Sequence, residues 1–564
     1  MRKLTSSLKL PSYSEKTPHL GRLSGFLTVS LGASMILSGC FFETKSSIFK
    51  DYKNENPSYA HSSQIQLMMN DFGGLSTDTL KTNAFPWKVV VASVVTKRHY
   101  DQGADISKDT FQKVLKEYGF ILPDKILNLK EGVPQPKLEF PVGIVRGDLE
   151  INIGLKPKTE IANFTCATCH SSRVFNAQGR ATNDMWLGAP NASMNLQGYT
   201  SEIYESLKFV GRSPSEFNRN LKTIFPEITH QEYESIKKFF YPETIRQMNI
   251  IEKGSNTLLS FFNGPPGSAN GIGSLKRVIG MTGPGIYDPQ ERGFVNIPDF
   301  SDRKFRRNLT VSGIYTPLGE TPLTEVTEDQ ATNQRAWAIS PVAALFLSMV
   351  MGEPVAKTEK QIPVMQEVFA DFISNYKAPK FPGELDEMKA LRGEKLYNNS
   401  CVKCHGQYSA GVNQPHLISY PNVLIPVDKI GTDKTRLEVL DKKFRYKTKD
   451  YWVSQKIQVI YRDGYMAPIL SNLWSSAPYL HNGSVPTLWA LMNPEVRPQT
   501  FYTGGHALDF KKVGITYYEN ETPYSKPVLV DTRERGSSNK GHEKSFAKLS
   551  SEEKWDLIEY LKTL

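Results

Sequence analysis

Cysteine is scarce in this chain: its 564 residues include only five, at positions 40, 166, 169, 401 and 404. Four of them form two Cys-x-x-Cys-His patterns, and the fifth stands alone at the end of an apolar run. Each cysteine therefore has a chemical role of its own, and none is left for a disulfide. A chain of this length can be stabilised by burial of apolar surface in two to four domains, which excludes a small disulfide-stapled fold.

Long apolar runs and clustered basic charge are also missing. The apolar stretches at 23–37 and 340–352 are both shorter than the roughly 20 residues that a membrane-spanning helix needs. The formal net charge is +10, of which the first 39 residues contribute +4, which leaves +6 for the rest. No basic patch interleaved with aromatic residues occurs, so the composition argues against nucleic acid as a partner.

The amino terminus has the pattern of an export signal. A basic stretch precedes the apolar run 23–37, whose length suits a signal peptide. The run ends in Leu-Ser-Gly-Cys at 37–40, which resembles a bacterial lipoprotein lipobox and implies cleavage of residues 1–39 and acylation of Cys40. No aspartate follows Cys40, so the resemblance places a lipid-anchored protein on the periplasmic side of the envelope, at the outer membrane. The alternative is an ordinary signal peptide, or an uncleaved anchor, with an incidental cysteine.

Composition divides the remaining chain into a tether and two domains. Residues 40–85 are polar and rich in Asn, Ser and Lys, as in a flexible tether. A break rich in proline and glycine at 379–383 separates an N-terminal domain, 86–378, from a C-terminal domain, 379–564, because a new helical pattern starts directly after it.

Helical periodicity dominates both domains. Helices are expected over 107–118, 231–240 and 340–352, and after Ser550, which forms a capping box with Glu553. Gly and Pro crowd the stretch between residues 264 and 298 and predict irregular loops there. Because sustained strand alternation is scarce, we expect a mainly α fold with long irregular loops.

The two Cys-x-x-Cys-His pentapeptides carry the strongest chemical signal. Each places two thiols at i and i+3 and an imidazole at i+4 on one side of a helical turn. This spacing fits haem c, because two thioethers hold the porphyrin while the adjacent histidine reaches its iron. We therefore expect two covalently bound haems, with His170 and His405 as iron ligands. The residues that would bind them are Cys166, Cys169 and His170 for the first haem, and Cys401, Cys404 and His405 for the second.

Other interpretations of the cysteine pairs fit less well. A zinc ribbon would bring both pairs together, usually across fewer than the 231 residues between Cys169 and Cys401, and would not need a histidine after each pair. A thioredoxin-like pair would occur once, in a βαβ context. Export agrees with haem, since c-type attachment takes place outside the cytoplasmic membrane.

The sequence around the second motif resembles a class I cytochrome c. The residues that carry this likeness flank the motif and lie in the closing helix: Ala390, Gly393, Leu396, Tyr397, Gly406, Trp555 and Tyr560. Gly393 would let the helix before the motif cross the closing helix at short distance. The resemblance implies a cytochrome c-like fold for the C-terminal domain.

A wider resemblance is to the bacterial dihaem cytochrome c peroxidases, closest to the branch of dihaem rubber oxygenases. It rests on four stretches, Ala477–Leu488, Gly431–Asp433, Arg497–Pro498 and Gly541–His542. It covers roughly residues 100–564, most strongly in the carboxyl half. It implies two cytochrome c-like haem domains, with the reaction centre in the first and an electron-transfer haem in the second. It also allows one calcium ion between the domains, for which the sequence names no ligands.

The resemblance names a sixth ligand for the second haem. His542 is the first candidate, because relatives in the oxygenase branch place a histidine just before the closing helix. Met492 follows, since the peroxidase branch uses a methionine in this neighbourhood, although it suits simple helix packing equally well. Met466 is a further candidate. His481 is expected to brace loops by hydrogen bonding.

The distal side of the first haem is less well defined by the sequence. Trp186 and the turn 188–191 follow the first motif, and Asp299, Phe300 and Arg303 lie where relatives build the pocket. Each of these residues fits a packing role as well as a catalytic one. The tryptophan that relatives place between the haems has no obvious counterpart here.

The resemblance implies a peroxidase. Electrons from a small donor protein, a cytochrome or a cupredoxin, would enter at the haem on His405 and reduce hydrogen peroxide at the haem on His170. One alternative is a dioxygenase that cleaves an unsaturated hydrophobic substrate at the same iron. Another is a pure electron carrier in which both irons are six-coordinate.

Overall fold

The structure is a computed structural model, and it describes twelve stretches of the chain. They are residues 42–45, 62–69, 85–151, 156–254, 258–259, 261–282, 287–336, 338, 366–454, 457–505, 507–516 and 524–564. The export signal, the acylation site Cys40 and the helix expected over 340–352 lie outside the described residues.

The fold mixes helices and strands, so the expectation of a mainly α fold is wrong. Helices account for 40% of the structure and strands for 16%, in many small sheets. The largest sheet has the order β1-β3-β4-β2, and all its neighbouring strands are antiparallel. Its strands are β1 (Phe42–Lys45), β3 (Ile144–Ile151), β4 (Lys158–Phe164) and β2 (Phe85–Pro86). β1 comes from the stretch expected to be a tether, as does α2 (Ser63–Met69), which lies against the first motif.

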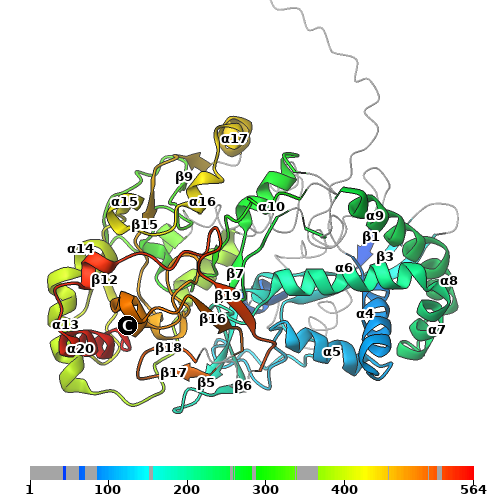
Figure 1. The fold of residues 1–564 in the computed structure, drawn as a ribbon, viewed down its shortest axis with the longest axis horizontal. Helices are drawn as coiled ribbons and strands as arrows, with labels where there is room; N and C mark the ends of the chain where they lie inside the picture. The colour runs from blue at the N-terminus through cyan, green and yellow to red at the C-terminus, as the bar shows by residue number, and fades with distance from the viewer. Residues whose placement is uncertain are drawn as a thin grey trace, which may run out of the picture.

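A group of helices lies beside this sheet at the right of Figure 1, some of them against its strands and the others against neighbouring helices. They are α4 (Trp87–Gln102), α5 (Lys108–Glu117), α6 (Leu196–Arg212), α7 (Pro214–Ile224), α8 (His230–Ser235) and α9 (Tyr241–Gly254), with a π-helical turn, η3 (Ile236–Phe240), between the last two. Two expected helices are confirmed here, since Ser107 caps α5 and the 231–240 region is helical. Trp87, on α4, is fully buried in the core between these layers.

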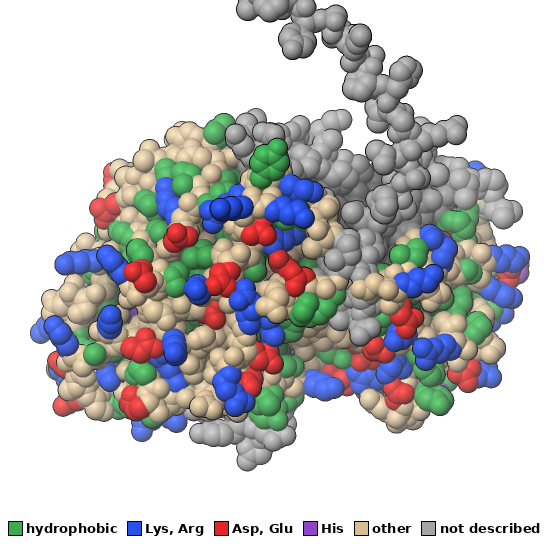
Figure 2. Space-filling model, turned by 45° about the horizontal axis from the view of Figure 1, so that its top comes forward, with side chains coloured by type: hydrophobic (Ala, Val, Ile, Leu, Met, Phe, Trp, Pro, Cys, Tyr) green, Lys and Arg blue, Asp and Glu red, His purple; other side chains and the backbone are tan. Residues whose placement is uncertain are grey.

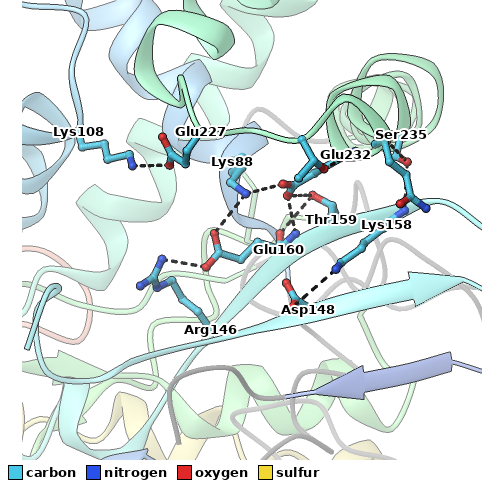
Figure 3. Close-up of polar contacts among 12 residues, drawn as sticks. Lys88, Lys108, Arg146, Asp148, Lys158, Thr159, Glu160, Glu227, Glu232 and Ser235 are labelled. Carbon is cyan, nitrogen blue, oxygen red and sulfur yellow. Dashed lines mark hydrogen bonds and ion pairs between the residues drawn. The ribbon is translucent and has the colours of Figure 1, made fainter. Parts of the chain in front are cut away.

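Buried charges join the helices to the sheet (Figure 3). Nζ of Lys88 on α4 lies 2.6 Å from Glu232 on α8 and 3.9 Å from Glu160 on β4. Arg146 on β3 pairs with the same Glu160 at 2.8 Å. Burial raises the pKa of Glu160, and the two cations oppose this. Every charge in the cluster thus has an opposite partner, as buried ions require.

The C-terminal part is built on a helix crossing at the left of Figure 1. α13 (Glu387–Ser400) runs into the second motif on α14 (Val402–His405) and crosses α20 (Ser551–Leu561). A Cβ at Gly393 would lie 2.0 Å from the carbonyl oxygen of Asp556, so only glycine allows this approach. The capping box of Ser550 and Glu553 is confirmed.

Short elements fill the space between these helices. The strands are β5 (Ser171–Phe175), β6 (Ala181–Leu187), β7 (Ser268–Ala269), β8 (Val295–Asn296), β9 (Tyr315–Pro317), β10 (Val326–Thr327), β11 (Gln407–Tyr408), β12 (Leu417–Tyr420), β13 (Leu424–Pro426), β14 (Ile457–Val459), β15 (Gly464–Met466), β16 (Thr500–Thr503), β17 (Leu508–Asp509), β18 (Gly514–Ile515) and β19 (Val528–Asp531). The helices are η2 (Cys166–Thr168), α10 (Gly271–Val278), η4 (Arg303–Phe305), α15 (Val427–Ile430), α16 (Thr435–Glu438), α17 (Lys442–Ser454), η5 (Leu473–Ser475), α18 (Leu488–Met492), η6 (Pro494–Val496) and α19 (Glu543–Phe546).

The structure shows no clear layout of two cytochrome domains, which corrects the second part of the expected fold class. Strands from before residue 379 pair with strands from after it: β9 with β14 and β10 with β12. The core of the C-terminal part also contains Phe175 and Phe305 from the first part. The two parts therefore share sheets and core, instead of each closing on itself.

The surface mixes charges of both signs. On the face in Figure 2, Lys and Arg are interspersed with Asp and Glu, and apolar side chains are scattered among them. Among the described residues, every helix is too short or too polar to span a bilayer.

Candidate haem-binding sites

The four motif cysteines are partly buried. None of them is in a disulfide. Burial raises the pKa of Cys401 to about 11 and the pKa values of Cys166 and Cys169 to about 12. The thiols therefore stay protonated near neutral pH, unlike the low-pKa thiolates of catalytic cysteines.

The second motif closes α13 and presents its histidine to a partner histidine. Nδ1 of His405 donates to the carbonyl of Pro468 at 2.8 Å, which leaves Nε2 free to bind a metal. The rings of His405 and His542 have centroids 6.4 Å apart and planes inclined by 28°. Two metal–imidazole bonds of about 2 Å each, together with the two ring radii, span roughly 6 Å. The gap thus fits one iron held between two imidazoles.

The local backbone places His542 in this position. Its φ of 67° is left-handed, and its N–H donates to the carbonyl of Ile430 at 3.0 Å. Its Nδ1 is buried and has no hydrogen-bond partner in the protein, so the ring nitrogens are not held by other side chains and fit a metal ligand. Burial lowers the pKa of His542 to about 4, with smaller contributions from His405 and Arg497, so the ring is a neutral ligand at physiological pH.

Arg497 clamps the loop that carries His542. Its guanidinium, with a side chain only 4% exposed, donates to the carbonyls of Asn539 at 2.6 Å and Gly541 at 2.9 Å. It also pairs with Glu543 at 2.8 Å, on the other side of the histidine. The Arg497 side chain therefore fixes the residues before and after His542 in the sequence.

The first motif is held between the large sheet and a loop. The N–H of His170 donates to the carbonyl of Cys166 at 2.9 Å, which closes the turn η2. The hydroxyl of Thr168 donates to Gly143 at 2.6 Å, and the N–H of Asn191 donates to Cys169 at 2.8 Å. The 188–191 turn therefore supports the motif from behind.

His170 lies against a second loop. The ring of Phe300 is 4.4 Å from the ring of His170. The backbone of Pro298 contacts the same ring and favours its protonation, but no well-formed hydrogen bond reaches the buried Nδ1. Burial, and then the charge of Arg303, lower the pKa of His170 to about 3, so this imidazole is also neutral.

The loop of residues 298–303 therefore packs against the candidate ligand His170. Of the residues considered for a distal pocket, Phe300 takes the packing role, since its ring lies on that of His170. Arg303 donates to the carbonyl of Asp299 at 2.8 Å. Trp186 lies farther out, with its Nε1 donating to the carbonyl of Lys377 at 3.1 Å.

The two histidines are supported by a repeated turn that sequence reasoning missed. Each turn has the pattern Pro-x-x-Ser-Asx, at 298–302 and at 468–472. Asp302 and Asn472 are both left-handed, with φ of 55° and 59°, and each precedes a 3₁₀ turn, η4 or η5. The repeated proline, serine and Asx spacing was the signal available in the sequence.

The other candidate ligands occupy packing positions. Met492 is 1% exposed in the core on α18, and Met466 packs against Gly313 from β15. The ring of His481 lies 4.4 Å from that of Tyr465, and its carbonyl accepts from the N–H of Asn296 at 2.8 Å, so it braces two loops. Within the described part of the chain, no group of three or more His, Cys, Asp or Glu residues could hold a metal ion. The calcium ion thus stays a prediction without ligands.

Comparison with known families agrees with this site. A family model described as "RoxA-like, cytochrome c-like" matches residues 464–502, which include the turn behind His405 and the clamp Arg497. The match shows that this stretch is similar to a cytochrome c-like domain, the kind of domain that binds haem c covalently, and it supports the likeness to the rubber-oxygenase-like branch of dihaem cytochromes.

Two proteins of Sinorhizobium fredii are similar over most of their length. Protein y4iM is 27% identical over 376 residues, which cover 57% of this chain and 84% of y4iM. Protein y4iJ is 24% identical over 488 residues, which cover 72% of this chain and 78% of y4iJ. Both are described as uncharacterized, so their names carry no function to this chain.

Proposed function

We propose that the protein is a dihaem c-type cytochrome that reduces hydrogen peroxide, with the reaction at the His170 haem and electron entry at the His405 haem. The observation that carries this proposal is the difference between the two histidines. His405 faces His542 across a gap that fits one iron, whereas the ring against His170 is that of Phe300. The first geometry suits an iron with two histidine ligands, whereas at the second site His170 is the one candidate ligand among the contacts described.

The closed site suits electron transfer. A haem with two imidazole ligands has a lower reduction potential than one with His and Met, so it is a better electron donor. Reduction of hydrogen peroxide to two waters takes up two electrons and two protons, so a second redox centre is useful to this reaction. A small reduced donor protein, a cytochrome or a cupredoxin, would supply the electrons.

The His170 site would supply the reactive iron. Haem c held there by Cys166, Cys169 and His170 would supply the redox chemistry for peroxide or dioxygen. The chain's own contribution is a neutral imidazole, held by burial against Phe300 and the backbone of Pro298. Such fixed support keeps the iron ligand in one orientation.

A ligand-binding experiment tests the proposal. The reduced holoprotein should bind one carbon monoxide per two haems, and His542→Ala should raise this to two. The wild-type protein should consume peroxide at the expense of a reduced small cytochrome c, with two electrons used per peroxide. A wild-type protein that binds no carbon monoxide or cyanide would be a pure electron carrier, and the proposal would be wrong.

A dioxygenase is the second candidate, and the match to the RoxA-like family favours it. Such an enzyme would incorporate both atoms of dioxygen into a cleaved unsaturated hydrophobic substrate, without net use of electrons. Oxygen uptake with polyisoprene and no reductant, in a protein that does not consume peroxide, would support it over the peroxidase.

The cellular setting is also proposed. Export, acylation of Cys40 and attachment to the periplasmic side of the outer membrane follow from the lipobox resemblance. Metabolic labelling with a fatty acid should be lost in Cys40→Ala if this holds.

A further inference from the structure

The two repeated turns that support the histidines touch each other. Oγ of Ser471 donates to Oδ2 of Asp302 at 2.5 Å, and Nδ2 of Asn472 donates to Oδ2 of Asp299 at 2.8 Å. These bonds join residues about 170 positions apart, one turn from each part of the chain. We define these two segments, 298–303 and 468–473, as the paired turns.

Each of the paired turns also reaches one of the iron-binding histidines. In the first, Pro298 and Phe300 contact His170, and Asp299 lies between them. In the second, the carbonyl of Pro468 accepts the hydrogen bond of His405. A continuous chain of contacts therefore runs from one histidine to the other.

The contact between the turns is buried and densely bonded. Asn472 is fully buried, and Asp299 is 8% exposed. The carboxylate of Asp299 accepts hydrogen bonds from the N–H and the hydroxyl of Ser301, from Tyr376 at 3.0 Å and from Asn472. Removing the Asn472 donor would leave a buried acceptor with less compensation for its charge.

We propose that the paired turns couple the two haem sites, with Asp299 and Asn472 as positioning residues that set the reduction potential at His170 from the other part of the chain. The inference rests on the proposed function, since it needs a haem at each motif. The paired turns would then connect the two haem sites, a position in which no obvious tryptophan is found in the sequence. Hydrogen bonding behind an axial ligand and charge near it are established means by which proteins tune such potentials.

The chain offers a closely matched control for Asn472. Asn422 is the same residue type, is also fully buried and also has a left-handed backbone, with φ of 52°. Its amide likewise joins the two parts of the chain, donating to the carbonyl of Phe305 at 2.9 Å and accepting from Arg307 at 2.8 Å. Asn422 lies outside the paired turns. Glycine tolerates a positive φ, so Asn→Gly removes either amide without backbone strain.

The experiment is a spectroelectrochemical titration of both haems in purified holoprotein. In Asn472→Gly, the buried Asp299 carboxylate loses one hydrogen-bond donor. Its negative charge is then less compensated and should favour the ferric state of the His170 haem. The equilibrium constant for reducing the His170 haem should fall about tenfold, or 59 mV for one electron. Asp299→Asn should shift the same haem in the opposite direction. Asn422→Gly should lower the unfolding midpoint as much as Asn472→Gly while leaving both potentials unchanged.

Two results would overturn the inference: unchanged potentials in Asn472→Gly, or equal shifts in Asn472→Gly and Asn422→Gly. If Asn472→Gly does not fold, Ser471→Ala removes the second bond between the turns and should give a smaller shift in the same direction. Failure of the proposed function would look different, because the wild-type protein would then lack two haems or an open iron site.

Discussion

The crossing of α13 and α20 makes Gly393→Ala a sharp test of the fold around the second haem site. The new Cβ would lie 2.0 Å from the carbonyl oxygen of Asp556, whereas separations under 3.0 Å essentially never occur. The helices would have to move apart by at least 1 Å, and the obstacle is backbone, which cannot rotate away. Overpacking of this kind costs about 3 kcal/mol, and alanine's better helix propensity returns about 1. We expect a net loss of about 2 kcal/mol.

Gly211→Ala is the matched control for this prediction. Gly211 also lies in a helix, α6, but the nearest atom to its Cβ would be a side-chain atom, Cγ2 of Ile245, at 3.3 Å, so a shift of a few tenths of an ångström relieves the contact. This substitution should leave stability unchanged or raise it by up to about 1 kcal/mol. Urea unfolding of both variants, followed by tryptophan fluorescence and by haem absorbance, measures the difference. Equal stability of the two variants would refute the close crossing.

Three further predictions concern charge, pH and ligation. Glu232→Gln breaks a largely buried ion pair with Lys88 and should lower the free energy of unfolding by about 2 kcal/mol. Glu227→Gln, in an exposed pair with Lys108, should lower it by under about 0.5 kcal/mol in the same urea assay. Equal losses would contradict the arrangement in Figure 3. Burial lowers the pKa of His481 from 6.5 to about 4 in the folded protein. Between these two pH values the imidazole is protonated in the unfolded chain but not in the folded one, so the free energy of unfolding should fall as the pH drops from 6.5 towards 4. His481→Gln should flatten this pH dependence, and an unchanged slope would count against it. Arg497→Ala should release His542 and convert low-spin haem to a form that binds carbon monoxide; an unchanged spectrum would rule out the clamp.

The sequence names specific haem-attachment residues, which stay a prediction, whereas its prediction of the fold class is wrong. The spacing of 166–170 and 401–405 determines the attachment residues, because it is a local property of one helical turn. The capping box at Ser550 is local as well and is confirmed. The close approach at Gly393 is also confirmed, but it joins residues 163 positions apart and was expected only through a family likeness. His542 was selected only through a family likeness, and the structure brings it to His405.

The mixed fold was missed because most of its strands are very short. β3 shows a readable alternation, with Val145 and Leu149 buried and charged residues between them. Strands such as β10, with two residues, exist only through their partners in distant segments, which sequence periodicity cannot register. The support role of Phe300 was missed for the same reason, since its contact with His170 joins residues 130 positions apart.

Counting covalently retained haem tests the central claim most directly. After denaturation and extraction, the wild-type protein matured in a suitable host should keep two haems per chain in a pyridine haemochrome assay. Cys166→Ala with Cys169→Ala, and Cys401→Ala with Cys404→Ala, should each keep one. Complete loss of the chromophore from the wild-type protein on extraction would contradict the account.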